Sequence, residues 1–335
     1  MKFKRSISRI LVALFTVSII ASTQVKRAYA DAYKVVTLGA DLNSKQKEDM
    51  LKYFGVNKDE ANVIEVTNKE ENSYLKDVAS KKQIGTKAIS CSYVDPSSQN
   101  GLTISTNNMY WVTESMIRNA LITAGIENAD VKAAAPFRVS GTAALTGILK
   151  GFESSKGGKK IDEKKKKAAN EEIVVTGDLG EKIGKDEAAS LVNQVKKDVI
   201  KEKPKNEKEV QNIVLNVTNS FNKNSDKKLD DADIQKITEL MNKINGLDLN
   251  FKQLKAQLDD VTDKLKGTIT SDEARGFFEK LWDAITSFFK ELFSSNDNDD
   301  KNKEQKSEDK DNQKQDNRNN QSDKLPGNNI DTKNK

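Results

Sequence analysis

The stretch YKVVTLGADLNSKQKEDMLKYFGV, residues 33–56, decides the fold class of the first half of the chain. A short β-branched run ends at Gly39, and Asn43 or Ser44 then predicts the N-cap of a helix that Gly55 stops. A strand followed at once by an amphipathic helix indicates a sheet with helices packed on it.

The same alternation continues toward residue 153. The further predicted elements are a strand over 62–67, a helix begun by Asn68 and Glu71 and running through Val78, strands over 86–94 and 101–107, a helix over 111–124, a strand over 129–136 and a helix over 140–152. The two strands around DPSSQNG predict a hairpin. Small residues at Gly141, Ala144 and Gly147 predict close packing of a helix on the sheet, because the GxGxxG and phosphate-loop spacings are absent. IVVT at 173–176 repeats the wording of VVTLG and is expected to rejoin the sheet.

From about residue 185 the apolar period changes from two to about 3.6. Four stripes carry this period: Ala188, Val192, Val195 and Val199; Val210, Ile213, Val214, Val217 and Phe221; Ile234, Ile237, Met241 and Ile244; and Leu247, Phe251, Leu254, Leu258, Val261 and Leu265. The last resembles a short coiled-coil seam, but Pro204, Gly246 and Gly267 interrupt the region, which favours a helical bundle.

The predicted fold class is therefore mixed α+β, an N-terminal α/β sheet domain followed by an α-helical bundle and a disordered tail. The expected divisions are 1–30 as a signal peptide, 31–184 as the α/β domain, 185–293 as the bundle and 294–335 as the tail. The tail contains almost only Asn, Asp, Lys, Gln, Glu and Ser, which cannot bury enough apolar surface to offset ordering entropy.

Residues 1–30 have the parts of a secretory signal, with a basic start, an apolar run over 10–21 and small residues at Ala28 and Ala30. Cleavage is expected after Ala30, and the protein is expected to be secreted, in association with a cell envelope. Loss of the six basic residues of 1–30 leaves 50 basic against 51 acidic residues. That balance offers no concentrated basic face, so nucleic acid is not an expected partner.

The chain contains no histidine, which excludes His-dependent hydrolases and His-ligated zinc. Paired-carboxylate hydrolysis needs no imidazole and stays open, although no pair stands out. The single cysteine, Cys91, lies in an alternating stretch and is expected to be a small buried side chain. No catalytic, cofactor-binding or metal-binding residue is assigned, and no cofactor is expected.

The loop over 222–233 resembles an EF-hand in its spacing of Asn and Asp, but position six is Lys227 and position twelve is not Glu. A helix cap explains the same residues better. Asp230 is the expected N-cap, Asp233 answers it, and Leu229 precedes them as half of a hydrophobic staple.

The stretch FFEKLWDAITSFFKELF at 277–293 predicts an amphipathic helix with a wide aromatic stripe. Its proposed interaction surface consists of Phe277, Phe278, Leu281, Trp282, Phe288 and Phe289. Docking within the chain is favoured for this stripe. An envelope protein or a second copy is the next alternative, and membrane contact is less favoured because the polar face is net acidic.

Four stretches resemble a family of secreted Gram-positive proteins. They are VVTLGADLNSKQKEDMLKYFGV, IGTKAISCSYV, EEIVVTGDLGEKIG and the long NMYWVTESMIRNALITAGIENADVKAAAPFRVSGTAALTGILKGFE. The chain is similar to the domain of unknown function numbered one thousand and two, over roughly residues 31–290. The resemblance implies an exported envelope or extracellular protein and implies no activity, cofactor or catalytic residue.

These observations favour a secreted, non-enzymatic binding or structural protein of the bacterial cell envelope. Two alternatives remain open. One is a histidine-free envelope hydrolase with paired carboxylates, and the other is membrane contact or self-association through the aromatic helix.

Overall fold

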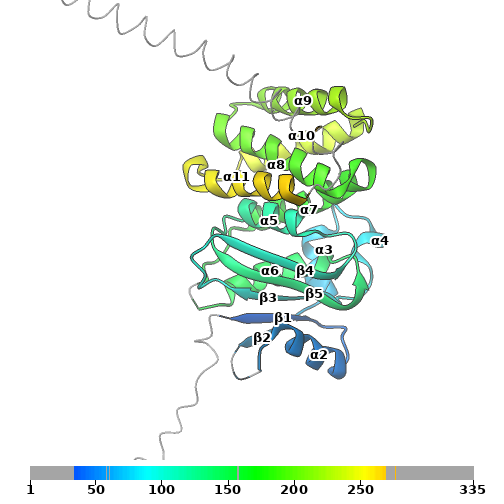
Figure 1. Ribbon diagram of the computed structural model, residues 1–335, viewed down its shortest axis with the longest axis vertical. Coiled ribbons are helices and arrows are strands. Elements are labelled where there is room, and N and C mark those ends of the chain that lie inside the picture. Colours follow the sequence, from blue (N-terminus) through cyan, green and yellow to red (C-terminus); the bar gives the residue numbers. More distant parts are fainter. Residues whose placement is uncertain (1–33, 58, 60, 157, 269–275, 277–335) are drawn as a thin grey trace, which may run out of the picture. The chain divides into compact units, whose positions relative to one another are not determined.

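The computed structural model describes residues 34–57, 59, 61–156, 158–268 and 276. Within them, five strands form one mixed sheet in the order β2-β1-β3-β5-β4 (Figure 1). The strands are β1 (Val35–Gly39), β2 (Asn62–Val66), β3 (Cys91–Asp95), β4 (Leu102–Met109) and β5 (Ala129–Val139). The outer pairs β1–β2 and β4–β5 are parallel, whereas β1–β3 and β3–β5 are antiparallel. A mixed sheet with helices, followed by a helical region, confirms the predicted fold class.

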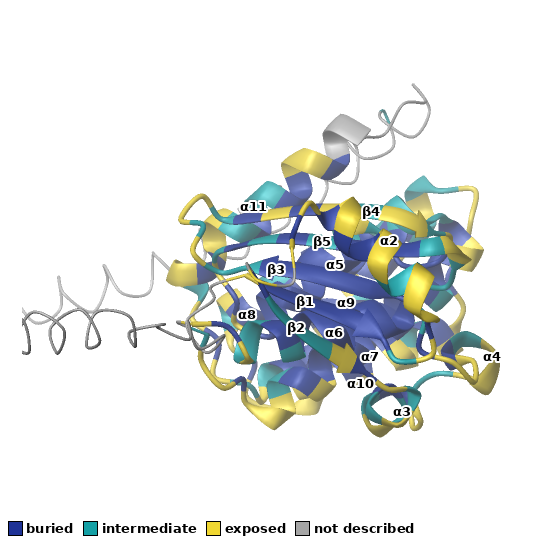
Figure 2. Cartoon of the chain, turned by 90° about the horizontal axis from the view of Figure 1, so that it is seen from below, coloured by how far each residue is buried: buried dark blue, intermediate teal, exposed yellow. Residues whose placement is uncertain are grey.

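The helices of the first half pack on the two faces of this sheet or on one another. They are α2 (Ser44–Phe54), α3 (Asn68–Leu75), α4 (Lys81–Ile84), α5 (Glu114–Thr123) and α6 (Thr142–Glu153). The α2 side chains Met50, Leu51 and Phe54 pack with Val36 and Leu38 on one face. Helix α6 lies on the other face, toward which Thr37 points, because successive side chains of a strand point to opposite faces. Figure 2 shows the buried interior running along the strands and α6.

Helix α6 lies very close to the sheet because it presents glycines there. A Cβ built on Gly147 would lie 3.1 Å from Ser92 Oγ and 3.3 Å from Thr37 Cβ. Thr37 Oγ1 donates a hydrogen bond to the Gly147 carbonyl at 2.9 Å. The close packing predicted from the small residues is confirmed.

Local caps place the first helices as their sequences indicate. Asn43 forms a capping box with Gln46, and Gly55 ends α2 at φ 69°. The cap of α3 was predicted one residue too late. Thr67 and Glu70 form its capping box, not Asn68 and Glu71, because Thr67 is the residue that stays extended at the strand end.

The predicted hairpin is wrong. Strands β3 and β4 are not neighbours, because β5 lies between them and pairs with both. The alanine-rich β5 is buried over Ala133, Ala134 and Ala135 and lies between β3 and β4, while β4 is the edge strand and its first residues alternate between buried and exposed.

The helical region comprises α7 (Glu163–Ile183), α8 (Lys185–Glu202), α9 (Glu207–Asn224), α10 (Asp231–Asn245) and α11 (Phe251–Thr268). The predicted strand at 173–176 is wrong, because IVVT lies inside α7. Helix α7 packs against α3, α5, α8 and α10 and is buried over nearly its whole circumference. A continuously apolar run in such a position does not reveal its period. The predicted apolar stripes of α8 to α11 are buried except at Ile234, Leu247 and Phe251, which are half-buried.

Helix α5 lies where the sheet meets the helical region (Figure 1). It contacts β4 on one side and α7, α8 and α11 on the other. The division of the chain at residue 184 stays a prediction. The structures of residues 1–30, of the aromatic helix over 277–293 and of the tail over 294–335 also stay predictions, because these residues lie outside the described ones.

Candidate functional site

A cavity of about 250 Å³ opens beside the edge strand β4, between its first residues and helices α5 and α11. The lining residues are Asn100, Gly101, Leu102, Thr103, Arg118, Ala256, Gln257, Asp260 and Lys264. Segments more than a hundred residues apart in the sequence therefore meet at this place.

Arg118 is the buried one of the charged residues that line this cavity. The residue is 6 % exposed, and its Nη1 donates to the Leu102 carbonyl and, at 3.1 Å, to Asp260 Oδ2. Burial lowers the pKa of Arg118, and the Asp260 carboxylate opposes part of that effect. An arginine has five N–H donors and stays charged in proteins. Both contacts use Nη1, so among the described residues the Nε and Nη2 groups have no acceptor.

Asp260 joins two cations at the cavity. Its Oδ2 lies 3.1 Å from Arg118 Nη1 and 3.1 Å from Lys264 Nζ, one turn further along α11. The Asp260 and Lys264 side chains are 43 % and 51 % exposed, so this part of the site faces solvent. The lining carries two positive charges against one negative charge and has a net charge of +1.

Helix α5, which carries Arg118, also binds the edge of the sheet at β4. The Leu102 carbonyl points away from β5, since the Gly101 carbonyl accepts from Ala129 in β5. Arg118 binds that outward carbonyl, and the Glu114 side chain accepts from the outward Thr106 N–H at 3.0 Å. Edge strands with free backbone groups invite pairing with other chains. Two residues four apart on α5 therefore bind two of the outward backbone groups of β4.

A second polar cluster lies fully buried between α5, α7 and α8. Lys196 Nζ donates to Glu172 Oε1 at 2.8 Å, to the Asn119 carbonyl at 2.7 Å and to Thr123 Oγ1 at 3.2 Å. Thr123 in turn donates to Glu172 Oε2 at 2.5 Å. Lys196 and Glu172 are both 0 % exposed, so the pair acts inside the fold and does not contact a ligand from solvent.

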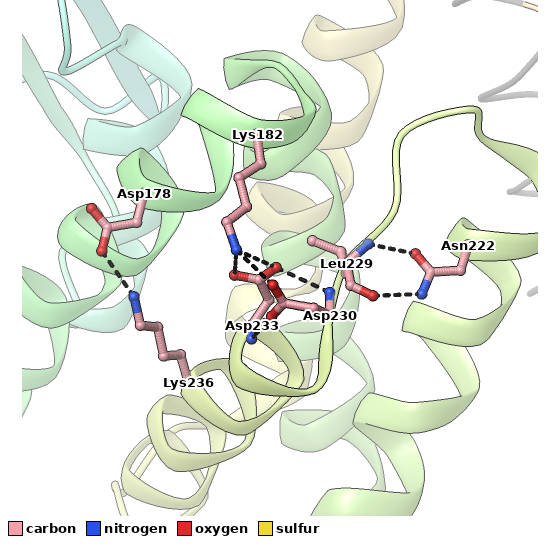
Figure 3. A network of polar contacts seen from close by, with 7 residues as sticks. All are labelled: Asp178, Lys182, Asn222, Leu229, Asp230, Asp233 and Lys236. Carbon is pink, nitrogen blue, oxygen red and sulfur yellow. Dashed lines mark hydrogen bonds and ion pairs between the residues drawn. The ribbon is translucent and has the colours of Figure 1, made fainter.

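The calcium-like loop has a different role in the structure (Figure 3). Asp230 and Asp233 form the predicted capping box at the start of α10. Lys182 Nζ lies 3.1 Å from Asp230 and 2.7 Å from Asp233, so an ammonium group occupies the place where these carboxylates converge. Asn222 closes the loop by exchanging hydrogen bonds of 2.9 Å and 2.8 Å with the Leu229 backbone. No group of three or more acidic or cysteine side chains within the described residues could hold a metal ion.

Two buried carboxyl groups lie away from the cavity. Burial raises the pKa of Glu71 to about 7, and its Oε1 has no hydrogen-bond partner among the described residues. Burial also raises the pKa of Asp198 to about 7, against the opposing hydrogen bonds from Gln194. Cys91 is 1 % exposed and belongs to the apolar core, as predicted, and burial raises the pKa of its thiol to about 11.

The interaction surface predicted from the sequence lies outside the described residues. Its members are Phe277, Phe278, Leu281, Trp282, Phe288 and Phe289. Conversely, sequence reasoning missed Arg118, Asp260 and Lys264. The one local signal was for Arg118, the single charged residue in the stretch SMIRNALIT, since a charged residue on a buried face needs a partner. In the described part of the chain, no helix combines the length and apolar character that crossing a bilayer requires.

Comparison of the sequence with known proteins shows the family of this chain. The sequence profile described as "Protein of unknown function (DUF1002)" matches residues 38–261. The chain belongs to the DUF1002 family. A relative from Bacillus subtilis (strain 168), "Uncharacterized protein YpuA", is 39 % identical over 265 residues, which cover 76 % of this chain and 89 % of the relative.

No solved structure matches this DUF1002 protein. The matched segment contains strands β2 to β5, the last two residues of β1, helix α5 and the α11 residues as far as Val261. Arg118 and Asp260 therefore lie within the family region, whereas Lys264 lies just beyond its end.

Proposed function

We propose that this DUF1002 protein is an exported binding protein of the bacterial cell envelope, which holds a small ligand in the Arg118 cavity without converting it. The observation that carries the proposal is the cavity itself, a solvent-facing hollow with an incompletely used guanidinium group. Binding sites commonly combine such a concave shape with a few polar groups that fix orientation.

The charge set of the cavity supports binding over hydrolysis. A carboxylate-pair glycosidase needs two carboxyl groups roughly 5–10 Å apart, one of them as acid and the other as base or nucleophile. Among the described residues that line the cavity, Asp260 is the single carboxylate, and it is paired with two cations. One carboxylate cannot fill both the acid role and the base or nucleophile role.

The N-terminal sequence supports the location. Its basic start, apolar run and Ala28-Tyr29-Ala30 have the order of a secretory signal. Export is tested by expressing the full chain in a Gram-positive host and measuring the N-terminus and mass of the protein in the wall and medium fractions. A mature N-terminus at Asp31 outside the membrane is expected, and an uncleaved chain found only in the cytoplasm would contradict the location.

The binding role is tested with a variant that fills the cavity. Ala256 is exposed on α11 and lines the cavity, so Ala256→Phe should fill it without removing a charge. Gln253 is exposed on the same helix and does not line the cavity, so Gln253→Phe is the matched control.

Each mature protein is incubated with a low-molecular-mass envelope extract, washed by gel filtration and examined by mass spectrometry of the released molecules. We expect one or more compounds of unchanged mass to be retained by the wild type and by Gln253→Phe but not by Ala256→Phe. Equal retention by all three proteins, or none, contradicts the proposal, and conversion of the added compounds to products would support the hydrolase alternative.

A further inference from the structure

The Arg118 cavity has a charge pattern that selects one chemical class of ligand. Resting on the binding role proposed above, we infer that it receives an oxyanion, a carboxylate or phosphate group, through the Arg118 guanidinium, with Lys264 as a second cation and Asp260 as an internal competitor. The inference goes beyond the presence of a ligand, because it names the group that the ligand must carry.

The first argument is the state of the guanidinium. Arg118 is held in place by the Leu102 carbonyl, a neutral backbone acceptor, so its position does not depend on the carboxylate. Its link to Asp260 is a single contact of 3.1 Å, and not the two parallel bonds that an arginine and a carboxylate can form. Nη2 and Nε have no acceptor among the described residues, and they form the planar donor pair that an oxyanion binds in bidentate fashion.

The second argument is the local charge. Arg118 is nearly buried, while Asp260 and Lys264 reach solvent around it. Both cations share one carboxylate oxygen of Asp260, so the described lining has a net charge of +1, and the Glu114 carboxylate outside the lining also acts on Arg118. Attraction between unlike charges grows as water is excluded, so an anion entering beside Arg118 gains more than it would on the open surface. A cationic ligand would meet Arg118 and Lys264 and is disfavoured.

The third argument is the neighbouring backbone. Leu102 turns its carbonyl toward Arg118, and its N–H lies on the same side of the strand because both groups of one residue point the same way. A backbone donor and a guanidinium group thus lie on the same side of β4. Backbone N–H groups and arginine side chains together are common partners of oxyanions.

The inference can be tested directly on the guanidinium. The Nε–H resonance of Arg118 in the mature protein is followed by NMR during titration with inorganic phosphate and acetate, and with glycerol as the neutral probe. Arg118→Lys assigns the resonance. We expect saturable shifts with both anions, none with glycerol, and weaker binding at higher salt because the contacts are electrostatic.

Three variants separate the roles of the neighbours. Asp260→Asn removes the competing carboxylate and should tighten phosphate binding by roughly three- to tenfold, while Lys264→Gln should weaken it by roughly threefold. Lys255→Gln is the matched control, because Lys255 also lies on α11 but pairs with Asp259 and does not line the cavity. Thermal unfolding of each variant shows that the fold is retained.

Two further arms distinguish the source of the group. Glycerol 1-phosphate presents it on a free small molecule, and phosphatidylglycerol vesicles present it on a lipid headgroup. Asp260- and Lys264-dependent binding in either arm supports the inference and identifies the source. Absence of a shift with every anion, or equal effects of Lys264→Gln and Lys255→Gln, overturns it. If compounds are still retained in an Ala256-dependent manner, the binding role stands and only the ligand class is wrong.

Discussion

Removal of one partner of the buried Lys196–Glu172 pair should destabilise the fold strongly. In Glu172→Gln, the ammonium group of Lys196 keeps the Asn119 carbonyl and Thr123 hydroxyl but loses its counter-ion at 2.8 Å. Breaking a buried pair in this way costs about 3–5 kcal/mol, because a charge is left uncompensated. The whole stability of a domain is about 5–15 kcal/mol, so the loss is a large fraction of it.

The interaction energy between Lys196 and Glu172 is measured by a double-mutant cycle that combines Glu172→Gln with Lys196→Met. The double variant should lose less stability than the sum of the two single losses, by about 1–3 kcal/mol, because neither partner is then left charged and alone. Urea unfolding of the mature protein at pH 7, followed by circular dichroism, gives each free energy. With a slope of roughly 3 kcal/mol per M, Glu172→Gln should lower the midpoint by roughly 1 M or more.

The adjacent residue provides the control. Lys197 pairs with Asp259, and their side chains are 23 % and 32 % exposed, so solvent screens this pair. Asp259→Asn should cost about 1 kcal/mol or less. If Glu172→Gln costs no more than Asp259→Asn, the argument that burial makes the Lys196 pair a major determinant of stability is refuted.

Three further predictions concern single groups. Burial raises the pKa of Asp198 to about 7, so between about pH 4 and 7 the folded state binds a proton that the unfolded state has lost, and the free energy of unfolding falls as the pH rises through this window. Asp198→Asn should therefore stabilise the protein at pH 8 and flatten the dependence, as urea titrations at pH 5 and 8 would show; an unchanged slope would contradict the assignment. Gly177→Ala should destabilise by about 1–3 kcal/mol, since a Cβ there would lie 2.2 Å from Trp111 Cζ2, and an unchanged melting temperature would exclude that contact. Asn43→Ala should cost about 1 kcal/mol through loss of the α2 cap, measured by thermal unfolding, and a neutral effect would remove the cap from the argument.

The sequence predicted those helix ends that are set by residues only a few positions apart in the chain. The Asn43 cap and the Gly55 stop set both ends of α2. The two errors in the sheet involve distant partners. The β3–β4 hairpin failed because β5, which follows α5 in the chain, enters between the two strands. The IVVT strand failed because α7 is surrounded by other helices, so its apolar run carries no periodic mark.

The cavity was out of reach of the sequence for a similar reason. Arg118 and Asp260 are separated by 142 positions, and neither lies in a motif of defined spacing. Lys196 is one of many lysines in the sequence, and only the packing of α8 shows that it is fully buried. Spacing reveals partners on one helix or one hairpin, whereas pairs across packed elements require the topology first.

Helix α5 explains why these polar groups occur together. Glu114 and Arg118 lie one turn apart and bind the open edge of β4, while Asn119 and Thr123 lie one turn apart and bind Lys196 on α8. Apolar contacts alone would let a helix slide or rotate between a sheet edge and a bundle at small cost, because they are not directional. Buried polar groups leave an unsatisfied partner in any other register, which is costly. Arg118, Asn119 and Thr123 are buried, whereas Glu114 is exposed, so we expect the three buried residues to fix the position of α5 and to hold the Arg118 guanidinium at the cavity before any ligand arrives.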